Sequence, residues 1–153
     1  METNQFINFT DKQHILNSIE KLNARTIPNF GILTPQHMLE HLAVNIQFSN
    51  GKNPLKSGRD GFNPMKGFLF SDEPLPKGTT FFLTGRKLPS HINSNLEDAI
   101  KYLINEINNF EKYFEENPTS KPNHAVFGNL NKEEWIIYHN KHFTHHFKQF
   151  GIY

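Results

Sequence analysis

Residues 139–153 read HNKHFTHHFKQFGIY and crowd imidazoles among aromatic rings. Of the nine histidines in the sequence, those at positions 139, 142, 145 and 146 fall within this stretch. An imidazole has a pKa of about 6.5, so neighbouring histidines repel one another as they become charged in mild acid. A cation shared by the neutral rings is the first explanation that this crowding suggests.

The same stretch continues a helical pattern that begins a few residues earlier. Asn131 is followed three residues later by Glu134, which resembles a capping box and predicts a helix from 131 to about 149. At about 100° per residue, one arc of roughly 60° on this helix holds Trp135, His139, His142 and His146. The last two lie one turn apart, so both can bind one metal from the same side, as in helical H-x-x-x-H zinc motifs.

Three further segments show helical periodicity of their apolar residues. The first covers 11–24, with Asp11 as its N-cap, and the third covers 95–116. The second begins at Thr34, with Pro35 at the first helical position, which is a strong start signal. The Gly- and Pro-rich region 51–92 lacks this periodicity and is too long for a simple connection, so we expect it to wall or cover a site. Within it, TTFFLT at 79–84 favours short strand pairing.

Four helices with one long crossover loop between the second and the third predict an all-α four-helix bundle. At 153 residues the chain has the usual size of one domain, so we expect a single domain over 1–153. The sequence contains 15 phenylalanines, which suggests a bulky aromatic core.

A third metal ligand has to come from another helix, and the second helix offers two histidines one turn apart. His41 flanks the apolar stripe beside Leu42, whereas His37 lies farther round and nearer the helix N-terminus, where the dipole disfavours a cation. We therefore prefer His41. His139 lies on the ligand face and is a candidate hydrogen-bond partner of a ligand or proton shuttle. Hydrogen-bonded core histidines and solvated surface histidines are the competing interpretation.

Composition excludes several classes of function and partner. The net charge is +1, with 16 basic and 15 acidic residues and no basic block, so nothing suggests nucleic acid or an anionic membrane. No apolar run approaches the roughly 18–20 residues of a membrane span. There is no cysteine, which excludes disulfides and a thiol nucleophile from the chain itself. The polar N-terminal residues lack a signal-peptide core, so we expect a cytoplasmic location.

Three segments together resemble the DinB/YfiT-like superfamily, in a branch of uncharacterised DinB-related proteins. They are TPQHMLEHLA at 34–43, FGNLNKEEW at 127–135 and HFTHHFKQFG at 142–151. The resemblance brackets nearly the whole chain, although 51–92 matches little. It implies a four-helix bundle with three histidines on one divalent metal, usually zinc or nickel, and the ligands fall on His41, His142 and His146. Relatives often continue with Arg-Gly-Gln where this chain has Phe-Lys-Gln, so no role is carried over for that arginine.

Relatives in this superfamily transfer low-molecular-weight thiols to electrophiles or isomerise a substrate with a thiol cofactor. The resemblance therefore implies a metal-dependent thiol S-transferase that acts on small electrophiles. Two alternatives stay open: a metal-dependent hydrolase, and a non-enzymatic, metal-stabilised binding or stress-response module. A purely structural metal would need a fourth protein ligand, for which His37 and His139 are the candidates, whereas an open position would favour chemistry. Dimers are common among relatives, so the resemblance is compatible with a homodimer, but no exposed stripe demands one and the oligomeric state stays open.

Overall fold

Helices dominate the part of the chain that the computed structural model describes, namely residues 6–56, 64–77 and 88–153. In chain order the elements are α1 (Lys12–Ile19), α2 (Pro35–Gln47), α3 (Lys66–Phe70), α4 (Leu96–Glu116), β1 (Asn123–His124), β2 (Gly128–Asn129) and α5 (Lys132–Gln149). The two strands pair only with each other, as a short antiparallel hairpin. The chain is thus mostly helical, as the sequence predicts.

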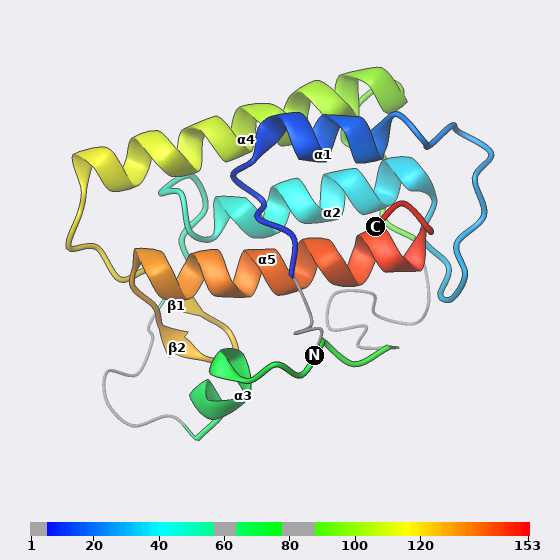
Figure 1. Ribbon diagram of the computed structural model, residues 1–153. Coiled ribbons are helices and arrows are strands. Elements are labelled where there is room, and N and C mark those ends of the chain that lie inside the picture. Colours follow the sequence, from blue (N-terminus) through cyan, green and yellow to red (C-terminus); the bar gives the residue numbers. More distant parts are fainter. Residues whose placement is uncertain (1–5, 57–63, 78–87) are drawn as a thin grey trace.

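The four longest helices lie side by side (Figure 1). Helix α2 contacts both α4 and α5, and α1 contacts α4. The short helix α3 lies against α5, below it in Figure 1. Because α2 and α5 are neighbours, side chains from the two histidine-bearing helices can meet between them.

Side-chain caps determine where the predicted helices begin. Asp11 accepts a hydrogen bond from the backbone N–H of His14, and Thr34 accepts one from that of His37. At α5 both halves of the capping box are present, since Asn131 accepts from the backbone of Glu134 and Glu134 accepts from the backbone of Asn131. These three start signals are confirmed, and they set which residues of α2 and α5 face each other.

The first helix is shorter than the predicted 11–24, because the chain tightens into a turn after Ile19. The backbone N–H of Leu22 bonds the carbonyl of Ile19 at 2.8 Å, an i to i−3 bond that replaces the α-helical pattern. The Thr26 hydroxyl then accepts from the Asn23 N–H at 3.0 Å. Leu22 stays buried even so, which explains why the apolar periodicity runs past the end of the helix.

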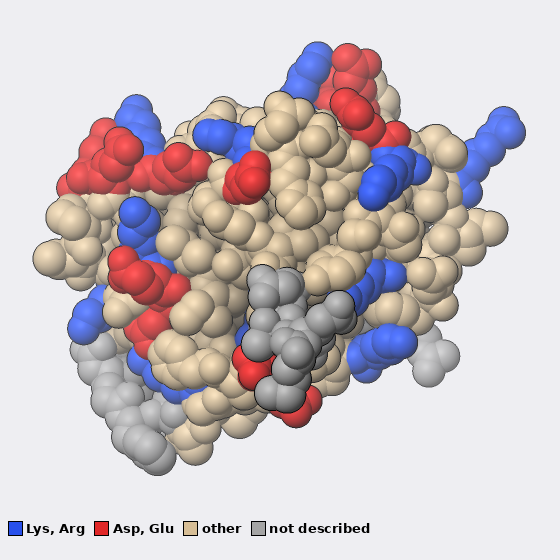
Figure 2. Space-filling model, viewed as in Figure 1, with Lys and Arg blue, Asp and Glu red and all other residues tan. Residues whose placement is uncertain are grey.

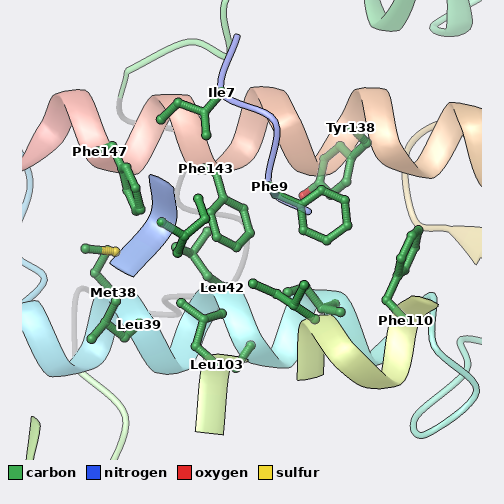
Figure 3. Close-up of a cluster of buried hydrophobic side chains, with 14 of the residues drawn as sticks. Ile7, Phe9, Met38, Leu39, Leu42, Leu103, Phe110, Tyr138, Phe143 and Phe147 are labelled. Atoms are coloured by element: carbon green, nitrogen blue, oxygen red, sulfur yellow. The ribbon is translucent and has the colours of Figure 1, made fainter. Parts of the chain in front are cut away.

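An aromatic core fills the space between the helices and the N-terminal segment (Figure 3). The Phe9 ring lies 5.1 Å from that of Phe110 and 5.5 Å from that of Phe143, between ring centroids. The buried phenylalanines are Phe9, Phe110, Phe114, Phe127, Phe143, Phe147 and Phe150. The backbone N–H groups of Ile7 and Phe9 bond side-chain oxygens of α5, at Thr144 and Asn140. The N-terminal segment is thereby attached to the last helix.

The connection between α2 and α4 contains a helix that the sequence does not predict. Helix α3 is five residues long, too short to show periodicity, and a contact distant in sequence holds it. Lys141 of α5 is only 1% exposed and donates to the carbonyls of Phe68 at 3.0 Å and Glu73 at 2.7 Å. Its Nζ also lies 4.8 Å from the centre of the Phe68 ring. The strand pairing expected at 79–84 lies outside the described residues.

Charges are mixed on the face of the molecule that Figure 2 shows. Acidic and basic side chains alternate over it, among larger areas of uncharged residues. Within the described ranges, no helix has the length and apolar character that a membrane span requires.

We predict that Asn131→Ala lowers the free energy of unfolding by about 1 kcal/mol, because it removes the side-chain oxygen that caps α5. Urea unfolding monitored by circular dichroism would measure the change. Asn105→Ala is the matched control, since Asn105 is exposed in the interior of α4 and alanine is a good helix former. Equal losses in the two variants would show that the cap contributes nothing.

Candidate metal centre

Three imidazoles from two helices converge on one point. The Nε2 atom of His142 lies 2.9 Å from Nε2 of His41 and 3.1 Å from Nε2 of His146. The ligand atoms of all three residues lie within 4.8 Å of one another. The structure thus brings together the three histidines that the sequence analysis named as candidate ligands. Helix α2 supplies His41, and α5 supplies His142 and His146.

Hydrogen bonding alone does not account for this cluster. A ring nitrogen carries either one proton or one lone pair, so Nε2 of His142 can form one good hydrogen bond, yet it has two close nitrogen neighbours. Two nitrogens that are each about 2.0–2.1 Å from a zinc ion stand roughly 2.9–3.4 Å apart at ordinary ligand angles. The two separations at His142 fall within this range, and the ligand atoms of His41 and His146 lie within 4.8 Å of each other.

The surroundings keep the three rings uncharged. Burial lowers the pKa of His41 to about 4, with a further contribution from nearby His145. Burial also holds the pKa values of His142 and His146 well below their usual range, and the neighbouring imidazoles lower them further. A metal binds the neutral imidazole, so this environment favours the form that can act as a ligand.

Comparison with known proteins places the chain in a family. A family model described as "Protein of unknown function (DUF1569)" matches residues 1–151. The chain belongs to the DUF1569 family. Comparisons with curated proteins and with solved structures give no match. Since the family description states no activity, the function has to be argued from the residues themselves.

His139 of this DUF1569 chain points into the aromatic core. Its Nε2 lies 2.8 Å from the Ser49 hydroxyl, and its ring stacks on Trp135 with centroids 5.2 Å apart. The Ser49 hydroxyl donates its hydrogen to the carbonyl of Ile46, so it accepts a hydrogen bond from the Nε2–H group of His139. Nδ1 of His139 is buried and has no hydrogen-bond partner among the described residues. A proton-shuttle role for His139 stays a prediction, and the ring is not one of the three that converge.

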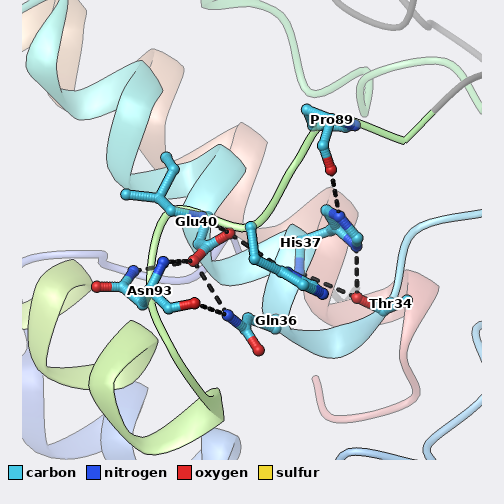
Figure 4. A network of polar contacts seen from close by, with 8 residues as sticks. Thr34, Gln36, His37, Glu40, Pro89 and Asn93 are labelled. Carbon is cyan, nitrogen blue, oxygen red and sulfur yellow. Dashed lines mark hydrogen bonds and ion pairs between the residues drawn. The ribbon is translucent and has the colours of Figure 1, made fainter.

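His37 is engaged away from the cluster as well (Figure 4). Its Nδ1 lies 2.6 Å from the Thr34 hydroxyl, and its Nε2 lies 2.7 Å from the carbonyl oxygen of Pro89. Its ring stacks on that of His91, with centroids 4.1 Å apart. Of the two candidates for a fourth ligand, His37 therefore has both ring nitrogens engaged elsewhere and His139 has its Nε2 at Ser49. The described residues place no further His, Asp or Glu in the cluster.

Glu40, next to His41 in the sequence, anchors the end of the long connection. Its carboxylate accepts from the backbone N–H groups of Ile92 at 3.0 Å and Asn93 at 2.7 Å (Figure 4). Burial raises the pKa of Glu40, but these hydrogen bonds together outweigh it and leave that pKa below its ordinary value. A carboxylate held in this way is a structural acceptor and is not available as a general base for the cluster.

Two polar residues that the sequence analysis did not single out support the ligands. Gln149 places its Oε1 at 2.7 Å from Nδ1 of His146. Asn45 donates to the backbone carbonyl of His41 and accepts from the hydroxyl of Tyr138, whose ring stacks on His142. Gln149 lies three residues after His146, and residues at this spacing are neighbours on the surface of a helix. The spacing could therefore have indicated their contact.

We predict that metal-free protein loses stability as the pH falls from about 6.5 toward 4. In this range the unfolded chain binds a proton at His41, whereas the folded chain does so only near the lower limit. Urea midpoints across the range would measure the slope, to which one such imidazole contributes up to about 1.4 kcal/mol per pH unit.

The His41→Gln variant should lose that part of the slope. Above pH 7.5 both states carry neutral imidazole, so the two proteins should there show parallel profiles. Profiles that stay parallel down to pH 5 would contradict the pKa of His41 given above.

Proposed function

We propose that this DUF1569 chain is a divalent-metal-binding protein with a DinB-like four-helix bundle, in which His41, His142 and His146 hold the metal. The observation that carries the proposal is the close approach of Nε2 of His142 to the Nε2 atoms of His41 and His146, with the ligand atoms of all three within 4.8 Å of one another. Neutral imidazoles suit zinc and nickel, and three of them leave the ion with its full charge. Zinc or nickel is therefore the proposed metal.

An incomplete set of protein ligands supports a catalytic role. The described residues provide three ligands, whereas structural zinc sites in proteins are almost always closed by four. When bound, a divalent metal acts there as a Lewis acid and favours the anionic form of a thiol or a water molecule. The chain itself lacks cysteine, so a thiol nucleophile has to come from a small-molecule cofactor.

The reaction proposed first is transfer of a low-molecular-weight thiol to a small electrophile. In this scheme His41, His142 and His146 stay neutral because they are buried, and the surrounding core keeps bulk water from the ligands on α5. Hydrolysis of a small substrate would use the same three ligands. The thiol reaction is preferred because of the likeness to DinB-like thiol transferases.

The burial of the ligands on α5 is the observation that favours a second function. His142 is 5% exposed and His146 is 6% exposed, which also suits a metal that stabilises the fold without catalysis. In that case removal of the metal would lower the free energy of unfolding, and the protein would turn over no thiol substrate. The two functions thus differ in turnover and not in metal content.

We predict that the purified chain binds one zinc or nickel ion and that His142→Ala retains almost none, since two imidazoles remain. Elemental analysis of the untagged protein would measure the metal content. His145→Ala is the matched control, because His145 adjoins His146 and does not belong to the cluster. Stoichiometric metal in a double variant with alanine at both 142 and 146 would refute the ligand assignment.

We predict that the metal-loaded protein consumes a low-molecular-weight thiol and a small electrophile together, and that the His41→Ala variant does not. The rate of thiol loss would be compared between the metal-loaded protein and protein treated with a chelator. A chelator-induced fall in melting temperature without any thiol or ester turnover would instead establish the non-enzymatic function.

A further inference from the structure

A buried amide stands directly behind one of the proposed ligands. Oε1 of Gln149 lies 2.7 Å from Nδ1 of His146, and the Gln149 side chain belongs to the core, with the residue 4% exposed. The other ring nitrogen of His146, Nε2, faces His142 at 3.1 Å. The amide and the cluster therefore occupy opposite sides of the same imidazole.

The far end of the amide determines which of its atoms faces His146. Nε2 of Gln149 lies 2.9 Å from the backbone carbonyl oxygen of Phe30, and a carbonyl can only accept a hydrogen bond. The amide nitrogen must therefore point at Phe30, and the amide oxygen must point at His146. Since that oxygen also only accepts, Nδ1 of His146 carries the proton and Nε2 keeps its lone pair.

The loop before α2 holds the amide in this orientation. The backbone N–H of Asn29 donates to the backbone carbonyl of Gln149 at 2.7 Å, next to the Phe30 contact. Gly31 follows with φ at +76°, and a Cβ there would lie 2.7 Å from Nε2 of Gln149. A side chain at 31 would displace the amide, so the glycine permits this close approach.

Among the described residues, the neighbouring His142 has no such partner: its Nδ1 is buried without a hydrogen bond, and the same is true of Nδ1 of His139. His139 is instead held through Nε2, by Ser49. A fixed proton on Nδ1 together with a free Nε2 lone pair directed at the cluster thus distinguishes His146 from His142.

We infer that Gln149 is a positioning residue that sets the tautomer of His146 and presents its Nε2 lone pair to the metal. The inference rests on the proposed function, because the benefit of the tautomer is tighter metal binding. Acceptors placed behind metal-bound histidines fix the ring and increase its basicity, and their removal typically costs about 10–100-fold in metal affinity.

The test compares three variants of the full chain. Gln149→Met keeps the length of the side chain and removes the acceptor, and Gln149→Glu keeps an acceptor oxygen. Ser49→Ala is the matched control, since it removes the hydrogen bond of another buried histidine on α5 without touching the cluster. Zinc affinity is measured by competition with a chromogenic chelator, and histidine tautomers are read from ¹⁵N ring spectra of metal-free protein.

The expected result is a loss of about 10–100-fold in zinc affinity for Gln149→Met, with Gln149→Glu much closer to wild type. The spectra should show Nδ1–H at His146 in the wild type and in Gln149→Glu, and a mixture of tautomers in Gln149→Met. Ser49→Ala should change the spectrum of His139 alone and leave zinc affinity unchanged.

Wild-type affinity in Gln149→Met, or an unaltered His146 tautomer, would overturn the inference. An equal loss of affinity in Ser49→Ala would do so too, since it would reveal a general loosening of α5. Failure of the wild-type chain to bind either zinc or nickel would overturn the proposed function instead. The spectra, recorded without metal, would still decide whether Gln149 sets the tautomer.

Discussion

Three uncharged imidazoles have to be satisfied where α2 packs against α5. Water is largely excluded there, and a buried polar atom without a partner costs free energy. Nε2 of His142 has two close nitrogen neighbours but can form one good hydrogen bond, so hydrogen bonds among His41, His142 and His146 do not by themselves satisfy the arrangement. The packing of the two helices and the satisfaction of the three imidazoles are in this way parts of the same constraint.

The helices that present the ligands also hold the long connection between α2 and α4. Glu40 immediately precedes His41 and binds the segment at 92–93, and Lys141 immediately precedes His142 and binds the α3 segment. Successive residues of a helix point about 100° apart, so one side chain turns toward the cluster and the one before it turns toward the connection. Buried charges next to His41 and His142 thus attach two described segments of the connection to the helices that carry the histidine cluster.

Local signals predicted much of this arrangement, and contacts between distant residues account for the rest. The caps at Thr34 and Asn131 and the one-turn spacing of His142 and His146 are short-range features, and the structure shows each of them. The choice of His41 over His37 followed from position on the helix and from family likeness. Helix α3 depends on the distant Lys141, so it could not be predicted from its own neighbourhood in the sequence. The spacing of Gln149 from His146 is local, but the contact with Phe30 that orients the Gln149 amide is not.

The attachment of the N-terminal segment to α5 affects the order in which the chain can fold during synthesis. The backbone donors of Ile7 and Phe9 are synthesised well before their acceptors on Thr144 and Asn140, which follow 137 and 131 residues later. Until α5 emerges, Phe9 lacks its aromatic partners on that helix, and His41 lacks the other two imidazoles of the cluster. A nascent chain therefore exposes this apolar surface until α5 has been synthesised, and the cluster of three histidines is completed only then.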